Sequence, residues 1–518
     1  MSQLDLGAIR AKEQQMTAAT LEAVKKICGA GNNEDLAKSW VQSNSAVSGL
    51  TFYDLESGAK LLYPVITPLR NEIPRVSGRG GIQANWRGIT GVNTTNMSAG
   101  VSFGNRSGRI TSTTKDYIAA YRAIGLEDSV DFEAELAAQG FDDVRAIAVE
   151  GLLRSLMMQE ERIDLGGNNS LALGTTPTPT TIDGGATPVA VTAASAHSIY
   201  CVALTRDGWE NSGGPTNDLT VGLPGQISRV SADGSNTDTF GGGNAKVSLV
   251  STLTPTQNHP LNMSVAPVPG AFAYAWYWGT STGAGATLGA ITTINSYQAL
   301  TDSGAGTQAA NDAKIAADYS QNTLVYDGLL TQISTTTNNS YIARLATGTV
   351  GTGTPLTTDN AGGIVEIDTA FKSFWDNYRL SPDTMWVNSQ EQKNISLKVL
   401  AAASTSSQRF VFDTVQGAVV GGTLVRSYLN KFTMNGAQEV PIRLHPNIPP
   451  GTIMFTSSRI PYPLSNVTNV LQIRARRDYY QIEWPLRTRK YEFGIYSDQV
   501  LQNYFTPAFG VIKNIGNG

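Results

Sequence analysis

The sequence predicts an α+β fold that is interrupted by an all-β sandwich. The chain has 518 residues, enough for more than one packed core. It is 41% hydrophobic and contains 52 glycines, which supplies more turn positions than a helical protein needs. Residues 171–310 carry only ten charges and short alternating runs, whereas both flanks mix helical and strand patterns.

Composition also limits the function. The formal net charge is −4 and only 15% of residues are charged, which argues against a basic nucleic-acid binder and an acidic disordered tail. The two cysteines, Cys28 and Cys201, make no disulfide framework, and no apolar run of 18 residues predicts a membrane span. The first residues lack the apolar core of a signal peptide. We therefore expect a protein that stays in a cytoplasm until it joins something else.

The N-terminal region contains two segments that lack a core face of their own. From Leu4 to Lys38 the pattern is polar and helical, with apolar residues too sparse for stable packing. Residues 50–72 alternate and contain prolines, which favours extended chain leading into a protrusion. The first 50 residues are therefore predicted to form an arm that gains order on a partner.

A basic stretch follows at 73–113, with a charge of +5 and no Asp, Glu or Lys. Its flanks, 83–90 and 100–110, alternate apolar and polar residues about a Gly/Asn/Thr centre, which predicts a long two-stranded hairpin. A hairpin of this kind is not stable alone, so we expect it to lie on another copy or partner. The basic residues predicted to make this contact are Arg75, Arg79, Arg87, Arg106 and Arg109.

An acidic segment at 127–143 carries a charge of −7 and leads into a helix. Asp142 or Asp143 is predicted to cap this helix, and Gly166-Gly167 to end it after about six turns. Its expected apolar stripe is Val144, Ile147, Ala148, Leu152 and Leu156, and Glu160 and Glu161 are expected to be exposed. The acidic residues predicted to face another subunit are Glu127, Asp128, Asp131, Glu133, Glu135, Asp142 and Asp143.

The insert at 171–310 shows closely spaced short strands with turn signals between them, which predicts a β-sandwich. Its three basic and seven acidic residues account for the whole net charge of the chain. Four aromatic residues, Tyr274, Trp276, Tyr277 and Trp278, stand close together on one predicted strand. Because side chains alternate along a strand, half of them should point into the core, although a stacking surface for sugars is an alternative.

After the insert the mixed pattern returns. Helices are predicted at 368–378 and 389–400, with a strand at 384–388 between them. The residues from 470 to 504 alternate like two or three antiparallel strands.

Catalytic chemistry has little support in the sequence. His197, His259 and His445 are too scattered for a predicted zinc site, and HExxH, CxxC and GxSxG motifs do not occur. Ser112 and Lys115 match the S-x-x-K spacing, but the companion motifs of that enzyme class do not occur. We therefore predict neither catalytic nor metal residues, no cofactor and no enzyme, with a hydrolase as a distant third hypothesis.

The order of four motifs resembles the tailed-bacteriophage major capsid protein family, with its Hong Kong phage-type fold. They are TPLRNEIPR (67–75), QEERIDLGGN (159–168) at the end of the long helix, NTLVYDGLLTQI (322–333) and QIEWPLRTRKYEFGIY (481–496). The resemblance implies the following division: an N-terminal arm (1–50), an extended loop and peripheral domain with a spine helix (51–170), an inserted β-sandwich (171–310), a mainly axial domain (311–460) and returning peripheral strands (461–518).

The insert has a resemblance of its own. SIYCVALTRDGWENS (198–212) and NMSVAPVPGAFAYAWYWGTSTG (262–283) are similar to strands and turns of fibronectin-III-like or immunoglobulin-like modules. The order of these pieces differs from that of a regular single module, so its topology stays open.

The capsid resemblance implies self-assembly of many copies, as pentamers and hexamers, into an icosahedral virion shell around double-stranded DNA. Expected partners are further copies of the chain, portal, scaffold or decoration proteins, and packaged DNA bound without sequence specificity; assembly is expected in the host cytoplasm. Some family members join subunits by a Lys-to-Asn isopeptide bond from the extended loop, but 73–113 contains no Lys.

The charges add the hypothesis that the basic stretch of one copy lies near the acidic segment of the next. The competing reading is a carbohydrate-binding or adhesive surface protein that uses the β-sandwich.

Overall fold

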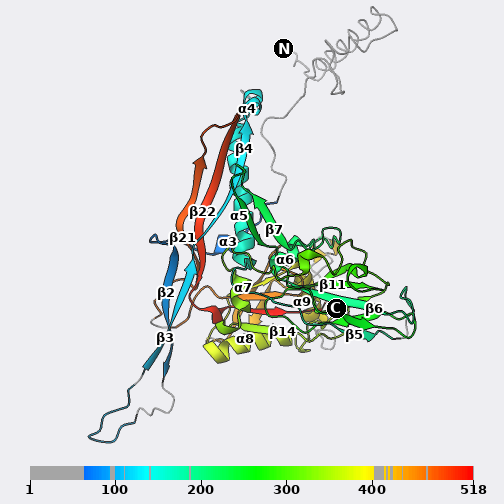
Figure 1. The fold of residues 1–518 in the computed structure, drawn as a ribbon. Coiled ribbons are helices and arrows are strands. Elements are labelled where there is room, and N and C mark those ends of the chain that lie inside the picture. Colours follow the sequence, from blue (N-terminus) through cyan, green and yellow to red (C-terminus); the bar gives the residue numbers. More distant parts are fainter. Residues whose placement is uncertain are drawn as a thin grey trace, which may run out of the picture. The chain divides into compact units, whose positions relative to one another are not determined.

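The computed structural model describes residues 64–93, 100–109, 111–138, 142–185, 188–401, 414–415, 418–419, 424–434, 436–462 and 465–516 (Figure 1). The predicted N-terminal arm lies outside these residues. The chain divides into two compact units, and the larger one comprises Tyr63–Ala137 and Val144–Gly518. Every sheet described below belongs to this larger unit, and its mixture of helices and sheets confirms the predicted α+β fold.

One four-stranded sheet packs against a long helix. The helix α5 (Val144–Gly166) has 23 residues, which confirms the prediction of about six turns. The sheet has the order β1-β21-β22-β4, and apolar side chains of β4 and β22 pack on Leu152 and Leu156 of the helix. The helix therefore has its core face on this sheet. The strands are β1 (Arg75–Ser77), β4 (Arg122–Asp131), β21 (Leu471–Glu483) and β22 (Lys490–Asn503).

The predicted two-stranded hairpin is present, but its second strand differs from the prediction. β2 (Gln83–Asn93) pairs antiparallel with β3 (Thr111–Ala120), and residues 100–109 lie outside both strands. The stretch TSTTKDYIAA is rich in β-branched residues, whereas GVSFGNRSGR is rich in Gly, Asn and Ser, which favour turns. In Figure 1 this arm hairpin, β2 and β3, extends away from the other strands of its unit.

The lead-in to the arm hairpin was also predicted incorrectly. Residues Pro68–Glu72 form the short helix α3 rather than extended chain, with Pro68 in its first turn. Proline fits there because the first helical N–H groups have no partner within the helix. Leu69 of this helix is buried, so α3 belongs to the core.

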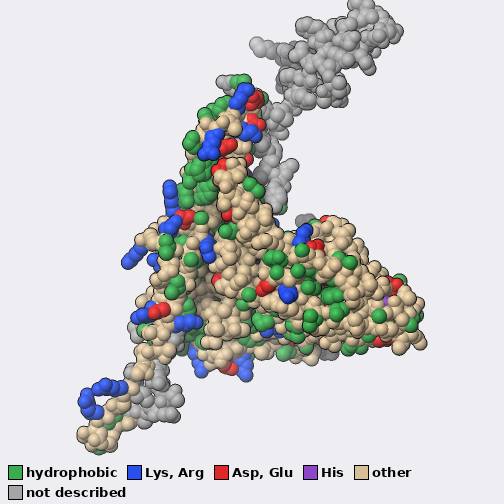
Figure 2. Space-filling view, viewed as in Figure 1, with side chains coloured by type: hydrophobic (Ala, Val, Ile, Leu, Met, Phe, Trp, Pro, Cys, Tyr) green, Lys and Arg blue, Asp and Glu red, His purple; other side chains and the backbone are tan. Residues whose placement is uncertain are grey.

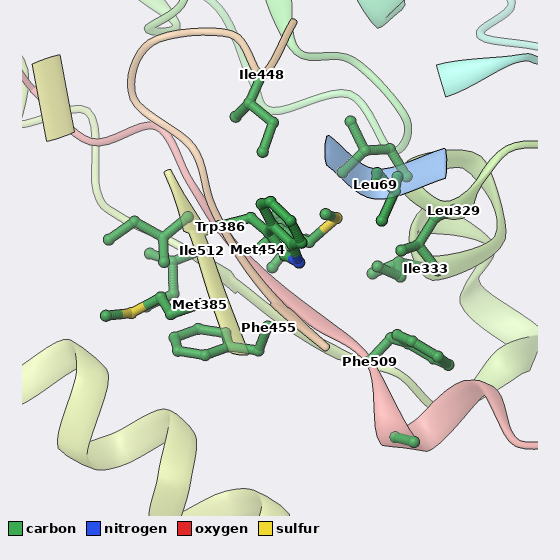
Figure 3. Close-up of a cluster of buried hydrophobic side chains, with 14 of the residues drawn as sticks. Leu69, Leu329, Ile333, Met385, Trp386, Ile448, Met454, Phe455, Phe509 and Ile512 are labelled. Carbon is green, nitrogen blue, oxygen red and sulfur yellow. The ribbon is translucent and has the colours of Figure 1, made fainter. Parts of the chain in front are cut away.

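The largest core surrounds a mixed six-stranded sheet of order β14-β23-β20-β15-β19-β18. Trp386, Met454 and Phe455 of this sheet are fully buried with Leu69 and Phe509 (Figure 3). The flanking helices are α7 (Leu329–Ser334), α8 (Val365–Tyr378) and α9 (Ser389–Ala401). The strands are β14 (Tyr341–Arg344), β15 (Thr384–Val387), β18 (Ser427–Asn430), β19 (Gln438–Leu444), β20 (Ile453–Thr456) and β23 (Gly510–Lys513).

The insert contains two sheets that share one apolar core, one of order β13-β10-β5 and one of order β12-β11-β6-β9. The fibronectin-III-like or immunoglobulin-like assignment of this region stays a prediction. A separate hairpin, β7–β8, and a short helix, α6 (Arg206–Asn211), complete it. The strands are β5 (Thr180–Asp183), β6 (His197–Leu204), β7 (Gln226–Val230), β8 (Thr237–Gly241), β9 (Ser251–Leu253), β10 (Leu261–Ser264), β11 (Ala273–Gly279), β12 (Thr287–Thr292) and β13 (Ser296–Ala299).

Candidate assembly surfaces

The arm hairpin exposes apolar side chains that a folded subunit would normally cover. Ile89 is 72% exposed on β2, and Ile118 is 67% exposed on β3. Phe103, between the two strands, is fully exposed. Because two strands alone are at best marginally stable in water, and because these apolar side chains are uncovered, this hairpin is a candidate interaction surface.

The five arginines of the basic stretch fall into three settings. Arg79, Arg106 and Arg109 are exposed. Arg87 pairs with Asp116 across the arm hairpin at 2.5 Å, and both side chains remain largely exposed. Arg75 pairs with the fully buried Glu160, and its own side chain is only 20% exposed, so it differs from the other four. Lys and Arg side chains are visible at the far end of the hairpin in Figure 2.

The acidic segment is partly neutralised by the start of β22. Lys490 lies 3.2 Å from Asp131, and Arg489 lies 2.8 Å from Glu133. Near α4 (Phe132–Ala138), basic and acidic side chains are therefore mixed on the surface (Figure 2). Sequence reasoning counted the acidic residues along one stretch and missed this cross-strand compensation.

The remaining acidic residues differ in their environment. Glu127 accepts a hydrogen bond from the Tyr496 hydroxyl. Asp128 is exposed and Glu135 half-buried, and neither has an ion pair among the described residues. Asp142 and Asp143 directly precede α5 and fall in the other compact unit. Within the described residues no ion pair joins the basic stretch to the acidic segment, so their contact between copies stays a prediction.

A buried ionic cluster lies at the base of the arm hairpin and centres on Glu160 of α5. The Glu160 carboxylate lies 2.6 Å from Arg70 Nε, 2.5 Å from Arg75 Nη1 and 2.6 Å from Gln499 Nε2. The Tyr479 hydroxyl also donates to it. Glu160 thus joins α3, β1, β21 and β22 to the long helix.

Glu161 holds the start of α3. Its carboxylate accepts hydrogen bonds from the backbone N–H groups of Leu69 at 2.9 Å and Arg70 at 2.6 Å. His445 Nε2 lies 2.6 Å from the same carboxylate, and both side chains are fully buried. Because His445 Nδ1 accepts the backbone N–H of Asn447, the ring proton sits on Nε2 and is donated to Glu161.

Asp164 is the third buried carboxyl of this helix. Burial and the neighbouring Glu160 charge raise its pKa well above the ordinary range. The Tyr326 hydroxyl donates to it at 2.6 Å. Burial would also raise the pKa of Glu160, but Arg75, Tyr479 and Gln499 outweigh that effect and lower it.

The expectation that Glu160 and Glu161 are exposed was wrong, since both have no solvent-accessible surface. A signal was available in the spacing: steps of four residues from the buried Leu152 and Leu156 reach Glu160 and Asp164, on one helix face. The predicted stripe was also too broad at its beginning, because Ile147 is 39% exposed. Paired arginines allow carboxylates to continue an apolar stripe into the core.

The four aromatic residues of β11 are core residues on both faces of the strand. Tyr274, Trp276 and Trp278 face the core shared by the two sheets of the insert, and Tyr277 faces a second core on the opposite side. Each is at most 5% exposed. The adhesive hypothesis therefore loses the sugar-stacking residues on which it depended.

The three histidines have carboxylate partners within the chain. His197 lies 3.0 Å from Asp302, and His259 lies 2.5 Å from Asp183. In the part of the chain that the structure describes, no group of three or more His, Cys, Asp or Glu residues is arranged to hold a metal ion. None of the described helices is both long and apolar enough for a membrane span.

Comparisons with known proteins give structural neighbours only. No protein-family model and no curated protein matches the sequence. The chain is similar to the capsid of cyanophage A-1(L), with 10% identity and a TM-score of 0.41, over 93% of this chain and 99% of that one. It is also similar to the capsid of Myoviridae phage XM1, with 10% identity and a TM-score of 0.37, over 94% and 99% of the two chains.

A third similar structure is the holo-SrpI encapsulin complex of Synechococcus elongatus PCC 7942. The identity is 9% and the TM-score 0.33, over 90% of this chain and 97% of that one. The phage capsids are of the class that the motif order resembles. Identities near 10% and TM-scores below 0.5 limit the likeness to the general course of the chain, and neither activity nor partners are taken from it.

Proposed function

We propose that this chain is the major capsid protein of a tailed phage. Copies assemble as pentamers and hexamers into an icosahedral shell around a double-stranded DNA genome, in the cytoplasm of the host. The observation that carries the proposal is the arm hairpin, which exposes Ile89, Phe103 and Ile118 at the end of a firmly held base. Exposed apolar side chains on a two-stranded arm are suited to contact with a second copy.

The buried ionic cluster supports the proposal because it holds the chain that leads into the arm. Arg75 stands on β1, five residues after Arg70 of α3 and eight before β2 begins, and both arginines bind Glu160 of the long helix. A surface held in its bound orientation loses less conformational freedom on association. A fixed base with an open arm is therefore suited to repeated contact between identical copies.

Surface charge also supports the proposal, because the arm carries exposed basic residues and the acidic segment carries acidic residues that could face them on a second copy. Arg79, Arg106 and Arg109 are exposed on the arm, and Asp128 and Glu135 remain outside the ion pairs of the described residues. Opposite charges on two copies speed their encounter and fix register more than they add affinity. We assign the charged contact between copies to these residues.

The domain division and the further partners belong to the same proposal. The arm hairpin is the extended loop, the sheet on α5 is the peripheral domain, and the six-stranded sheet is the axial domain. The insert stands on the outer surface of the shell as a fibronectin-III-like or immunoglobulin-like module. Portal, scaffold or decoration proteins and packaged DNA are further partners in this account.

Electron microscopy of the purified full-length chain tests the proposal. Closed particles tens of nanometres across in negative stain are the expected result. A monodisperse monomer in sedimentation, under the low-salt and physiological-salt conditions tried, would contradict it.

A further inference from the structure

The end of the arm hairpin presents one aromatic side chain on a closed turn. The Asn105 N–H donates to the Ser102 carbonyl at 3.1 Å, and the Asn105 side-chain amide donates to Ser102 Oγ at 2.6 Å. Gly104, with φ of +82°, takes the left-handed position of this turn, which favours glycine. Phe103 stands beside it and is fully exposed.

Phe103 has no function in the folding of its own subunit that the structure shows. The turn is closed by Ser102 and Asn105, and Phe103 is fully exposed. Aromatic side chains dominate the energetics of protein interfaces, and a preformed turn lowers the ordering cost of binding. Phe103 on this preformed turn therefore has the properties of a residue that contacts another molecule.

A cleft of about 330 Å³ in the larger unit offers an apolar lining for such a side chain. It lies between β4, α5, α6, the β7–β8 hairpin and the chain at 322–325. Ile227 and Phe240 are cross-strand partners in that hairpin, so they present one apolar face to the cleft. The half-buried apolar residues that line it are Leu126, Ile163, Ile227, Phe240, Leu324 and Val325.

The charged side chains that line the cleft each have an ion-pair partner within the chain. Arg162 lies 2.6 Å from Glu210, and Arg206 lies 2.8 Å from Asp207. Arg229 pairs with Asp238 across the β7–β8 hairpin at 3.2 Å. The cleft therefore favours an apolar occupant and leaves charge recognition to its surroundings.

Charge next to the cleft matches charge next to Phe103. Strand β4 continues from Leu126 of the cleft to the exposed Asp128, about 7 Å further at the usual strand rise. Arg106 follows Phe103 by three residues. The Cα atoms of Phe103 and Arg106 are therefore at most about 10 Å apart. A phenylalanine in the cleft therefore brings Arg106 within reach of Asp128.

We propose that Phe103 of one copy inserts into the cleft between β4, α5 and the β7–β8 hairpin of a second copy, with Arg106 beside Asp128. The inference rests on the proposed function and deepens it, because it names the two surfaces that meet. It also gives the insert a direct part in the contact between copies, since two walls of the cleft, α6 and β7–β8, come from it.

A side-chain deletion tests the contact residue. Phe103→Ala is expected to lower the yield of particles tenfold or more while the melting temperature of the subunit stays unchanged, because the side chain is fully exposed among the described residues. Phe103→Leu, which keeps an apolar side chain, is expected to recover most particles. The matched control is Ile182→Ala on β5, another exposed apolar residue, at 59%. A normal particle yield for Phe103→Ala would overturn the proposal while leaving the capsid function intact.

Photo-crosslinking locates the partner surface without disturbing it. Particles carrying Phe103→p-benzoylphenylalanine are assembled from a mixture of ¹⁴N and ¹⁵N copies, irradiated and digested for mass spectrometry. Mixed-isotope crosslinks to peptides containing 123–126, 156–163 or 227–240 are the expected result. Crosslinks confined to other peptides, or to the same copy, would overturn the proposal. A preparation of wild-type chain that forms no particles would instead contradict the proposed function.

Discussion

The arm hairpin and its base use ionic pairs in opposite ways. At the base, Glu160 is fully buried and binds Arg70 and Arg75, so charge fixes internal geometry. On the hairpin, Arg87 and Asp116 face solvent, and water and salt screen their pairing. The difference shows that the same residue types specify the fold where they are buried and remain available for recognition where they are exposed.

The largest effect is expected from Glu160→Gln. Removing this charge leaves two arginines at the base without their buried partner, which costs about 3–5 kcal/mol of the free energy of unfolding. Urea denaturation of the subunit measures the loss. Glu150→Gln on the same helix is the control, because the exposed Glu150 pairs with Arg154 one turn away. Equal effects of the two substitutions would show that burial at the base does not matter.

Low pH should destabilise the buried ionic cluster at the foot of the arm hairpin, because it protonates the Glu160 carboxylate. Its partners hold the pKa of Glu160 below its ordinary value of 4.5. The resulting stabilisation is therefore complete above about pH 4.5 and is lost as the pH falls through the folded-state pKa. Chemical denaturation from pH 7 to pH 3 should show a decline in this window that is smaller in Glu160→Gln. A variant that declines as steeply as the wild type would contradict this origin.

Asp164→Asn is expected to act in the opposite direction. The pKa of Asp164 is raised above its ordinary value of 3.8, so the unfolded chain ionises at a lower pH than the folded one and stability falls as pH rises from 3.8. The variant cannot ionise, and its amide carbonyl can still accept from Tyr326. Its melting temperature should exceed that of the wild type at pH 7, and the gap should close near pH 3. A gap that is constant with pH would refute the account.

Reversal of the two acids that form no ion pair among the described residues is expected to affect assembly and not folding. Asp128→Lys with Glu135→Lys should slow particle formation at low salt, where repulsion from the arginines of a second arm is least screened. Light scattering during assembly at two salt concentrations follows the rate. Restoration by Arg106→Glu with Arg109→Glu would support the pairing, whereas normal rates at low salt for the acid variant alone would eliminate it.

The smallest effect is expected from Arg87→Ala. Its pair with Asp116 is exposed on both sides, so the free energy of unfolding should stay within the error of the measurement. The comparison with Glu160→Gln uses the same denaturation assay. A large destabilisation here would remove the distinction between the arm and its base.

Sequence patterns predicted the elements better than the contacts between them. The long helix and the hairpin follow from local spacing and turn chemistry, and the motif order named the class to which the capsid neighbours belong. The second strand of the hairpin was misplaced because the alternation of 100–110 resembles that of a strand, although its Gly and Asn content favours turns.

The contacts at the base depend on chain segments far apart in sequence. Glu160 accepts hydrogen bonds from Tyr479 and Gln499, which lie more than 300 residues away in sequence. No local sequence pattern predicts such partners. Likewise the acidic segment is compensated by Arg489 and Lys490, which its own composition does not reveal. Only the continuation of the Leu152–Leu156 spacing to Glu160 carried a usable signal.

Hydrogen exchange with mass spectrometry tests most directly the claim that the arm contacts other copies while its base is complete within one. Purified particles and dissociated subunits of the full-length chain are compared at the same pH. Peptides covering β2 and β3 are expected to gain protection in particles, and peptides covering 156–166 are expected to exchange equally slowly in both. Equal exchange of the arm hairpin in particles and subunits would contradict the account.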